Sequence, residues 1–126
     1  MKHHQYNPTY QFVKAPSDFN KYTDRELLQY CLGATMYMPG TKDFAQAVID
    51  KKYPGLTSMV MCFEDACREE DVPAAEINCI HVLETLADNV ENGTLKYEDI
   101  PLIFFRVRSV EQFKHFASML QPRHIK

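Results

Sequence analysis

In the segment Met59-Val-Met-Cys-Phe-Glu-Asp-Ala66, five apolar residues are followed directly by two adjacent carboxylates. An unbroken apolar run without alternation predicts a strand that is buried on both faces, as in a parallel sheet. Glu64 and Asp65 stand at its carboxyl end, where open α/β sheets and (β/α) barrels bind their ligands. The run therefore predicts a central parallel strand with a functional site at its end.

Two further apolar runs have the same form. One is Gly33-Ala-Thr-Met-Tyr-Met-Pro-Gly40, which closes in a Pro-Gly turn. The other is Pro101-Leu-Ile-Phe-Phe-Arg-Val-Arg-Ser109, which ends in Arg106 and Arg108. A proline is tolerated at the first position of a strand, and bulky apolar residues carry the rest of the run through a core. The chain therefore has three predicted strands, each ending in polar residues or a sharp turn.

Segments with helical spacing separate these strands. The first spans Asp43 to Lys52, with Thr41 as the predicted N-cap. The second has Pro73 in its first turn and stops at Asn92-Gly93, and the third is capped by Ser109. The three apolar faces consist of Phe44, Ala47, Val48 and Ile49, then Ile77, Ile80, Leu83, Leu86, Ala87 and Val90, and finally Val110, Phe113, Phe116, Ala117 and Leu120.

The alternation of strands and helices predicts an α/β fold, because parallel neighbours need a long crossover that returns to the starting edge of the sheet. A chain of 126 residues suits a small doubly wound sheet, whereas an eight-stranded barrel needs about 250 residues. Three strands alone would leave both edges of the sheet open. We therefore expect the amino-terminal part of something larger, a split product or a truncated chain. Residues 1–23 predict an extended arm.

Composition limits the classes of function. Charged residues make up 25% and apolar residues 45%, as in an ordinary globular domain. The formal net charge is -3 and no run of five like charges occurs, so the sequence predicts no nucleic-acid partner and no membrane partner. The four cysteines, at positions 31, 62, 67 and 79, favour reduced thiols in the cytoplasm over a disulfide framework.

Three motifs at the strand ends resemble the family of citrate lyase beta subunits and malyl-CoA lyases, also called the HpcH/HpaI aldolase family. They are Tyr37-Met-Pro-Gly40, Cys62-Phe-Glu-Asp-Ala-Cys67 and Arg106-Val-Arg-Ser109. The family shows Val-Pro-Gly, Asp-Leu-Glu-Asp-Ala-Val and Arg-Val-Asn in the same order and at similar separations. The Tyr-Met-Pro and Arg-Val-Arg variants are most similar to the branch of carbon-carbon bond lyases associated with tellurium-resistance biosynthetic operons.

The resemblance implies the N-terminal portion of a TIM (β/α)8 barrel, with about three parallel strand-helix units over residues 24–126 and none of the later strands. It implies a Mg²⁺-dependent lyase that makes or cleaves a carbon-carbon bond in a small carboxylate substrate, with a coenzyme A thioester as a further candidate. Arg106 aligns with the arginine that binds the substrate carboxylate, and Glu64 and Asp65 align with the paired catalytic acids near the metal. Arg108 replaces an asparagine and implies a second anion contact.

The same resemblance implies that this chain alone is not a complete enzyme. The direct metal ligands of the family lie on later strands, so Glu64 and Asp65 would lie near the metal and orient its water ligands without binding it directly. We therefore expect self-association or a complementing chain. A barrel also requires the strands in sequential order, with Gly40, Glu64 and Arg106 at one rim of the sheet.

Other interpretations of these residues are open. The Glu64-Asp65 pair could cap a helix, and Arg106 could form a purely structural ion pair with it, which would give a small non-enzymatic α/β module. Arg106 and Arg108 would share one face of a regular strand. The segment Pro39-Gly40-Thr41-Lys42 opens a helix and could receive a phosphate there, with a plain turn as the alternative.

Overall fold

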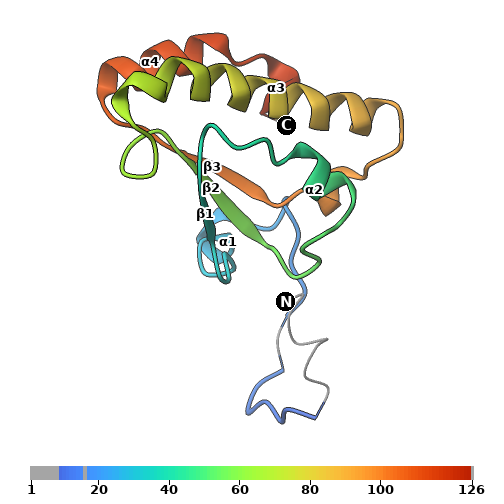
Figure 1. Cartoon of the computed structure of the whole chain (residues 1–126). Helices are drawn as coiled ribbons and strands as arrows, with labels where there is room; N and C mark the ends of the chain where they lie inside the picture. The colour runs from blue at the N-terminus through green and yellow to red at the C-terminus, as the bar shows by residue number, and fades with distance from the viewer. Residues whose placement is uncertain (1–8, 16, 126) are drawn as a thin grey trace.

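Three parallel strands form one sheet in the computed structural model, which describes residues 9–15 and 17–125. The strands are β1 (Met36–Pro39), β2 (Ser58–Cys62) and β3 (Leu102–Arg106), and β2 lies between the other two (Figure 1). This parallel pairing in sequential order confirms the predicted α/β class.

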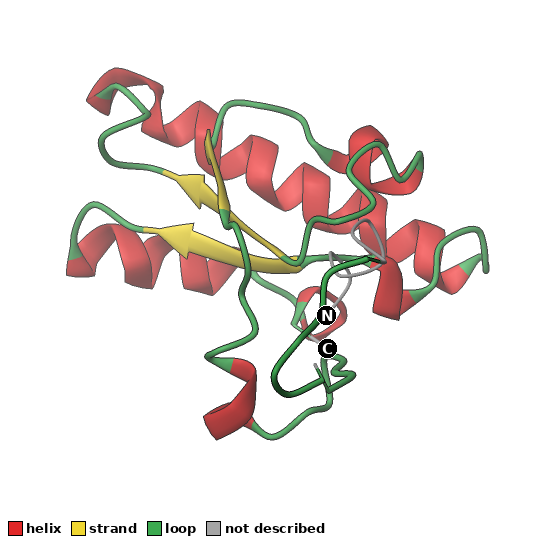
Figure 2. Cartoon of the chain, turned by 90° about the horizontal axis from the view of Figure 1, so that it is seen from below, coloured by secondary structure: helices red, strands yellow, loops and turns green. Residues whose placement is uncertain are grey.

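Helices α3 and α4 lie side by side over one face of the sheet, and α1 lies on the other side (Figure 1). When the molecule is seen from below, the strands lie in front of this helical layer (Figure 2). No helix in the described part of the chain is long and apolar enough to cross a membrane. The α-helices are α1 (Arg25–Leu28), α2 (Ala45–Ile49), α3 (Val72–Glu91) and α4 (Val110–Met119), and the 3-10 segments are η2 (Glu69–Asp71), η3 (Tyr97–Asp99) and η4 (Pro122–His124).

The central strand β2 is buried on both faces, as its apolar run predicted. Met59 and Met61 belong to the core cluster, together with Phe63, which directly follows the strand and is fully buried. The Phe63 ring stacks on Phe105 at a centroid distance of 6.0 Å and meets Phe116 edge-on at 5.0 Å. Each such ring contributes about 1.5–3 kcal/mol through burial. This aromatic cluster joins β2, β3 and α4 next to the carboxyl ends of the strands.

Helix α3 has the predicted ends but a different buried face. Pro73 lies in its first turn, and Gly93 follows it with a positive φ of 80°. Ile77, predicted on the apolar face, is 65% exposed. That prediction was wrong because residues advance by about 100° around a helix, which places Ile77 opposite the stripe that faces the sheet. The buried stripe consists of Ala75, Cys79, Val82, Leu83 and Leu86, with Glu76 at its margin.

The start of α2 also differs from the prediction. Thr41 is not its N-cap, because the Lys42 amide donates to the Pro39 carbonyl at 3.0 Å and closes a turn there. The helix begins only at Ala45, whose amide donates to the Asp43 carboxylate at 2.9 Å. Residues 39–42 therefore form a turn and do not open the helix.

Helix α4 is capped as predicted, since Ser109 Oγ accepts a hydrogen bond from the Gln112 amide at 3.1 Å. Phe116 is buried, as expected. Val110 and Phe113 were predicted on the same face, but they are 62% and 53% exposed. The prediction failed for them because the buried ring contacts of α4 with β2 and β3 are made by Phe116, further along the helix.

The sheet ladder continues past the strand ends and brings the three loops together. The Gly40 amide donates to the Cys62 carbonyl at 2.9 Å, and the Phe63 amide donates to the Arg106 carbonyl at 2.9 Å. Gly40, Glu64 and Arg106 therefore lie at one rim of the sheet. This arrangement confirms the geometry predicted for the strand ends.

Candidate functional site

An ion-pair cluster joins the carboxyl ends of β2 and β3. Arg106, the last residue of β3, uses Nη2 to contact Oδ2 of Asp65 at 2.9 Å and also Oε2 of Glu64. The side chains of Glu64, Arg106 and Asp65 are 35%, 42% and 72% exposed, so all three remain open to solvent or to a ligand. The structure thus brings together three of the four predicted site residues.

The charges of this cluster keep Arg106 ionised. Partial desolvation acts to lower the pKa of Arg106, but the carboxylates of Asp65 and Glu64 outweigh it and raise that pKa above its ordinary value. Among residues 9–15 and 17–125, these two acids are the only ion-pair partners of the Arg106 side chain. In both pairs the closest contact is made by Nη2. The guanidinium is therefore a fixed, oriented cation at the rim.

Arg108 follows a different path, because β3 ends two residues before it. Its Nε donates to the Phe63 carbonyl at 3.1 Å, and its Nη2 donates to the carbonyls of Glu64 at 3.1 Å and Cys67 at 2.6 Å. No carboxylate in the described part of the chain lies within ion-pair distance of Arg108. The second anion contact predicted for Arg108 would have to come from Nη1, and it stays a prediction.

The loop after β1 is anchored by helix α3. Asn78 Nδ2 donates to the Gly40 carbonyl at 2.7 Å and to the Lys42 carbonyl at 3.0 Å. A Cβ added at Gly40 would lie 2.8 Å from Phe63, so only glycine lets the backbone approach this ring. Asn78 was not among the residues predicted from the sequence. Its signal is an amide side chain inside a helix, where asparagine is unfavourable unless it finds a partner.

A second polar cluster links α3 to α4. Glu76 is only 4% exposed, and its two carboxylate oxygens contact Gln112 Nε2 at 2.8 Å and His115 Nδ1 at 3.0 Å. A buried carboxylate is tolerated when both oxygens are hydrogen-bonded in this way. No local pattern predicts this cluster, because Glu76 and Gln112 are 36 residues apart and meet only after α3 and α4 have packed.

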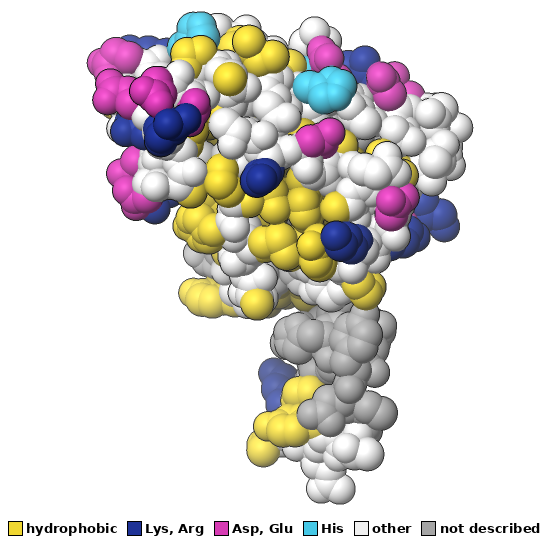
Figure 3. Space-filling view, in the orientation of Figure 1, with side chains coloured by type: hydrophobic (Ala, Val, Ile, Leu, Met, Phe, Trp, Pro, Cys, Tyr) yellow, Lys and Arg dark blue, Asp and Glu magenta, His cyan; other side chains and the backbone are white. Residues whose placement is uncertain are grey.

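At the end of the molecule where the strands have their carboxyl ends, acidic and basic side chains gather over the β2–α3 loop and the start of α4 (Figure 3). Arg68 in that loop pairs with Glu70 and Asp71, each at 2.8 Å. Its side chain is 74% exposed, so these pairs contribute little to stability. Arg68 thus resembles Arg106 in its pairing but lies outside the predicted site.

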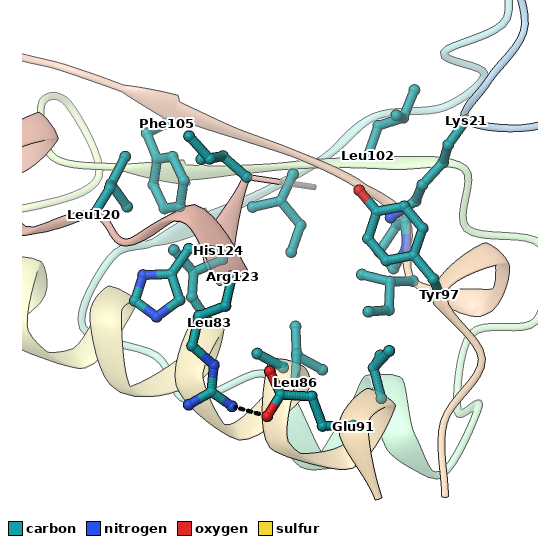
Figure 4. Close-up of a pocket in the computed structure, with 16 residues that line it drawn as sticks. Lys21, Leu83, Leu86, Glu91, Tyr97, Leu102, Phe105, Leu120, Arg123 and His124 are labelled. Atoms are coloured by element: carbon teal, nitrogen blue, oxygen red, sulfur yellow. Dashed lines mark hydrogen bonds and ion pairs between the residues drawn. The ribbon is translucent and has the colours of Figure 1, made fainter. Parts of the chain in front are cut away.

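A separate cavity of about 410 Å³ lies on the helical side of β3 (Figure 4). Apolar side chains such as Leu86, Leu102 and Phe105 form much of its wall, and Arg123 pairs with Glu91 at 3.0 Å beside it. Neither the acid pair nor the two predicted arginines line this cavity. The polar rim, where the charged groups converge, is therefore the stronger candidate for chemistry.

The described residues do not by themselves form a complete divalent-metal site. Within residues 9–15 and 17–125 there is no cluster of three or more histidine, cysteine, aspartate or glutamate side chains that could hold a metal ion. Glu64 and Asp65 offer the carboxylate oxygens that Mg²⁺ prefers, but both are paired with Arg106. They could accompany a metal ion only together with further ligands.

A family model described as C-C bond lyase of the TIM-barrel fold matches residues 26–126. Comparison with curated proteins and with solved structures finds no match. The matched range contains the three strands and the cluster formed by Glu64, Asp65 and Arg106. Because the match covers most of the sequence, the chain belongs to the C-C bond lyase family of the TIM-barrel fold.

Proposed function

We propose that this chain carries the carboxylate-binding part of a Mg²⁺-dependent carbon-carbon bond lyase of the citrate lyase beta subunit and malyl-CoA lyase type. One observation carries the proposal: Arg106 ends β3 as a solvent-accessible cation held by Glu64 and Asp65. It lies at the carboxyl ends of parallel strands, the rim at which TIM-barrel enzymes bind their substrates.

Arginine suits this role because its planar guanidinium can bind a carboxylate through two parallel N–H donors. Both acids make their closest contact with Nη2 of Arg106, so a substrate carboxylate would take one N–H bond from Nη1 or Nε and share Nη2 with the acids. Glu64 and Asp65 would hold the guanidinium in one orientation while the substrate binds. Such fixed geometry is what places a reacting carbon-carbon bond next to the catalytic groups.

A Mg²⁺ ion, when bound, would polarise a keto or thioester oxygen of the substrate. Its direct ligands would come from outside the described residues, with Glu64 and Asp65 nearby. The proposed substrate is a small 2-oxo or 2-hydroxy acid, and a coenzyme A thioester is the further candidate. A cytoplasmic setting is part of the proposal and is supported by the free thiols of Cys62, Cys67 and Cys79.

The proposal also includes further strands. β1 and β3 are the two edges of the described sheet, whereas a closed barrel has no edges. Strands contributed by another segment or another chain would pair with these edges, complete the rim and supply the metal ligands. Self-association or a complementing chain thus remains part of the proposed active form.

Titration with pyruvate, a stable 2-oxo acid, tests the proposal. The side-chain Nε–Hε signals of the arginines would be followed by NMR, and we expect the Arg106 signal to shift saturably. Arg106→Lys keeps the charge but loses the planar fork, so we expect pyruvate affinity to fall about tenfold. Arg68→Lys is the matched control, because Arg68 also pairs with two acids but lies outside the site.

Equal pyruvate affinity in the wild type and in Arg106→Lys would contradict the proposal. Arg106 would then be part of a structural ion pair, and the chain would be better described as a non-enzymatic α/β module. A loss of affinity in Arg68→Lys as large as that in Arg106→Lys would point to a general charge effect instead of a site.

A further inference from the structure

We infer that Arg108 is a positioning residue, which clamps the β2–α3 loop so that Glu64 and Asp65 meet Arg106. The inference rests on the proposed function, because it assigns a role within the same carboxylate-binding site. It differs from the prediction of a direct anion contact, since Arg108 would act on the substrate only through the acid pair and Arg106.

The first support is the set of groups that Arg108 touches. One guanidinium donates to the carbonyls of Phe63 and Cys67, which lie on either side of the acid pair, and to the carbonyl of Glu64 within it. The Cys67 amide also donates to the Glu64 carbonyl at 2.9 Å and closes the loop into a turn. Both ends of the acid-bearing turn are thus held by the same side chain.

The second support is the distribution of charge. Glu64 and Asp65 both pair with Arg106, although Arg108 donates to the backbone of the same loop. A guanidinium carries five N–H donors, and three hydrogen bonds to carbonyls take up most of its hydrogen-bonding capacity. Charge-assisted bonds of this kind are about twice as strong as neutral ones, which suits a clamp.

Helix α4 holds Arg108 itself in place. The Arg108 amide donates to Gln112 Oε1 at 3.1 Å, and Gln112 Nε2 donates to the buried carboxylate of Glu76. The first turn of α4 is fixed by the Ser109 cap. A continuous set of contacts therefore runs from Glu76 on α3, through Gln112 and Arg108, to the loop that carries the acids.

The first test needs no ligand. Arg108→Met keeps a long aliphatic side chain but removes the donors, and Arg108→Lys serves as a second variant that keeps the charge. In both we expect amide hydrogen exchange at Cys67 to accelerate about tenfold, because the turn loses its clamp. The Arg106 Nε–Hε signal should shift in the same direction as in Glu64→Gln, because the ion pair is loosened.

Exchange at Val82 in the core of α3 monitors global stability, and Arg68→Met is the control for removing an arginine from this loop. An unchanged Cys67 exchange rate and an unchanged Arg106 signal in both Arg108 variants would overturn the inference. This arm is independent of ligand binding, so it remains decisive even if the chain binds no pyruvate and the proposed function fails.

The second test is a double-mutant cycle on pyruvate affinity. Arg108→Met should weaken binding about tenfold in the wild-type background and have no further effect in Arg106→Ala, because Arg108 acts through Arg106. A direct anion contact would instead give the same loss in both backgrounds, and that result would overturn the positioning role. Tighter binding with Arg108→Lys than with Arg108→Met in the Arg106→Ala background would also indicate direct contact and overturn the positioning role.

Discussion

The Gly40→Ala substitution tests whether close packing holds the rim together. A Cβ at position 40 would lie 2.8 Å from Cε1 and 2.9 Å from Cδ1 of Phe63, and 3.1 Å from Cβ of Ala75. The two separations from Phe63 are shorter than real Cβ contacts, and the one from Ala75 is tighter than most of them. Phe63 cannot move away easily, because it is fully buried between Phe105 and Phe116. The added methyl group must therefore displace the loop after β1.

The loop after β1 is itself held by hydrogen bonds, and these add to the loss in the free energy of unfolding. Overpacking by one methyl group costs about 1–3 kcal/mol, and moving the loop strains the bonds of Gly40 to Cys62 and Asn78. We expect a loss of about 2 kcal/mol in the free energy of unfolding. For a chain of 126 residues this corresponds to a Tm lower by about 8 °C.

Urea unfolding followed by far-UV circular dichroism would measure the change. Gly93→Asn is the control, because Gly93 has open space around it and asparagine tolerates its positive φ. Phe63→Leu should make room for the new methyl group, so the double variant with Gly40→Ala should lose less than the sum of the two single losses. A Gly40→Ala protein within about 0.5 kcal/mol of wild type would refute the packing argument.

Three further substitutions probe the supports of the site. Ser109→Ala removes the cap of α4 and should lower the free energy of unfolding by about 1 kcal/mol in urea titrations. Ser109→Asp can still accept the capping hydrogen bond, so its free energy of unfolding should stay close to that of the wild type. Asn78→Ala removes two hydrogen bonds to the loop after β1 and should cost about 1–3 kcal/mol by the same assay. Burial raises the pKa of Cys79 to about 12, so the unfolded state loses this proton first as the pH rises. Relative to Cys79→Ala, the wild type should therefore lose about 1.4 kcal/mol of stability between pH 8 and pH 10, and parallel pH profiles would contradict this.

Several parts of the site could be predicted because they depend on local sequence. The apolar run before Glu64 predicted a buried central strand, and the alternation with helices predicted parallel strands in sequential order. Parallel strands bring their carboxyl ends to the same edge, so the sequence alone predicts that Glu64, Asp65 and Arg106 lie together. The Ser109 cap was predictable for the same reason, since a hydroxyl before a helical segment finds its amide partner locally.

Other features depend on contacts between residues far apart in the chain. Ile77 was wrongly predicted on the buried face of α3. Apolar residues occur on more than one face of this helix, and only packing against the sheet decides which face is buried. Arg108 could equally have faced a ligand, and it reaches the β2–α3 loop only because β3 ends at Arg106.

The order of strands and helices, and the rim on which the polar residues stand, follow from short-range periodicity and chain direction and can be read from the residues alone. The pairing of each charged side chain with its partners depends on the packed fold. Arg106 takes both carboxylates, Arg108 takes three carbonyls, and Glu76 finds Gln112 across the helical layer. A guanidinium has several possible acceptors within reach of a flexible side chain, and the choice among them depends on distances of a few ångströms that the packed fold alone establishes.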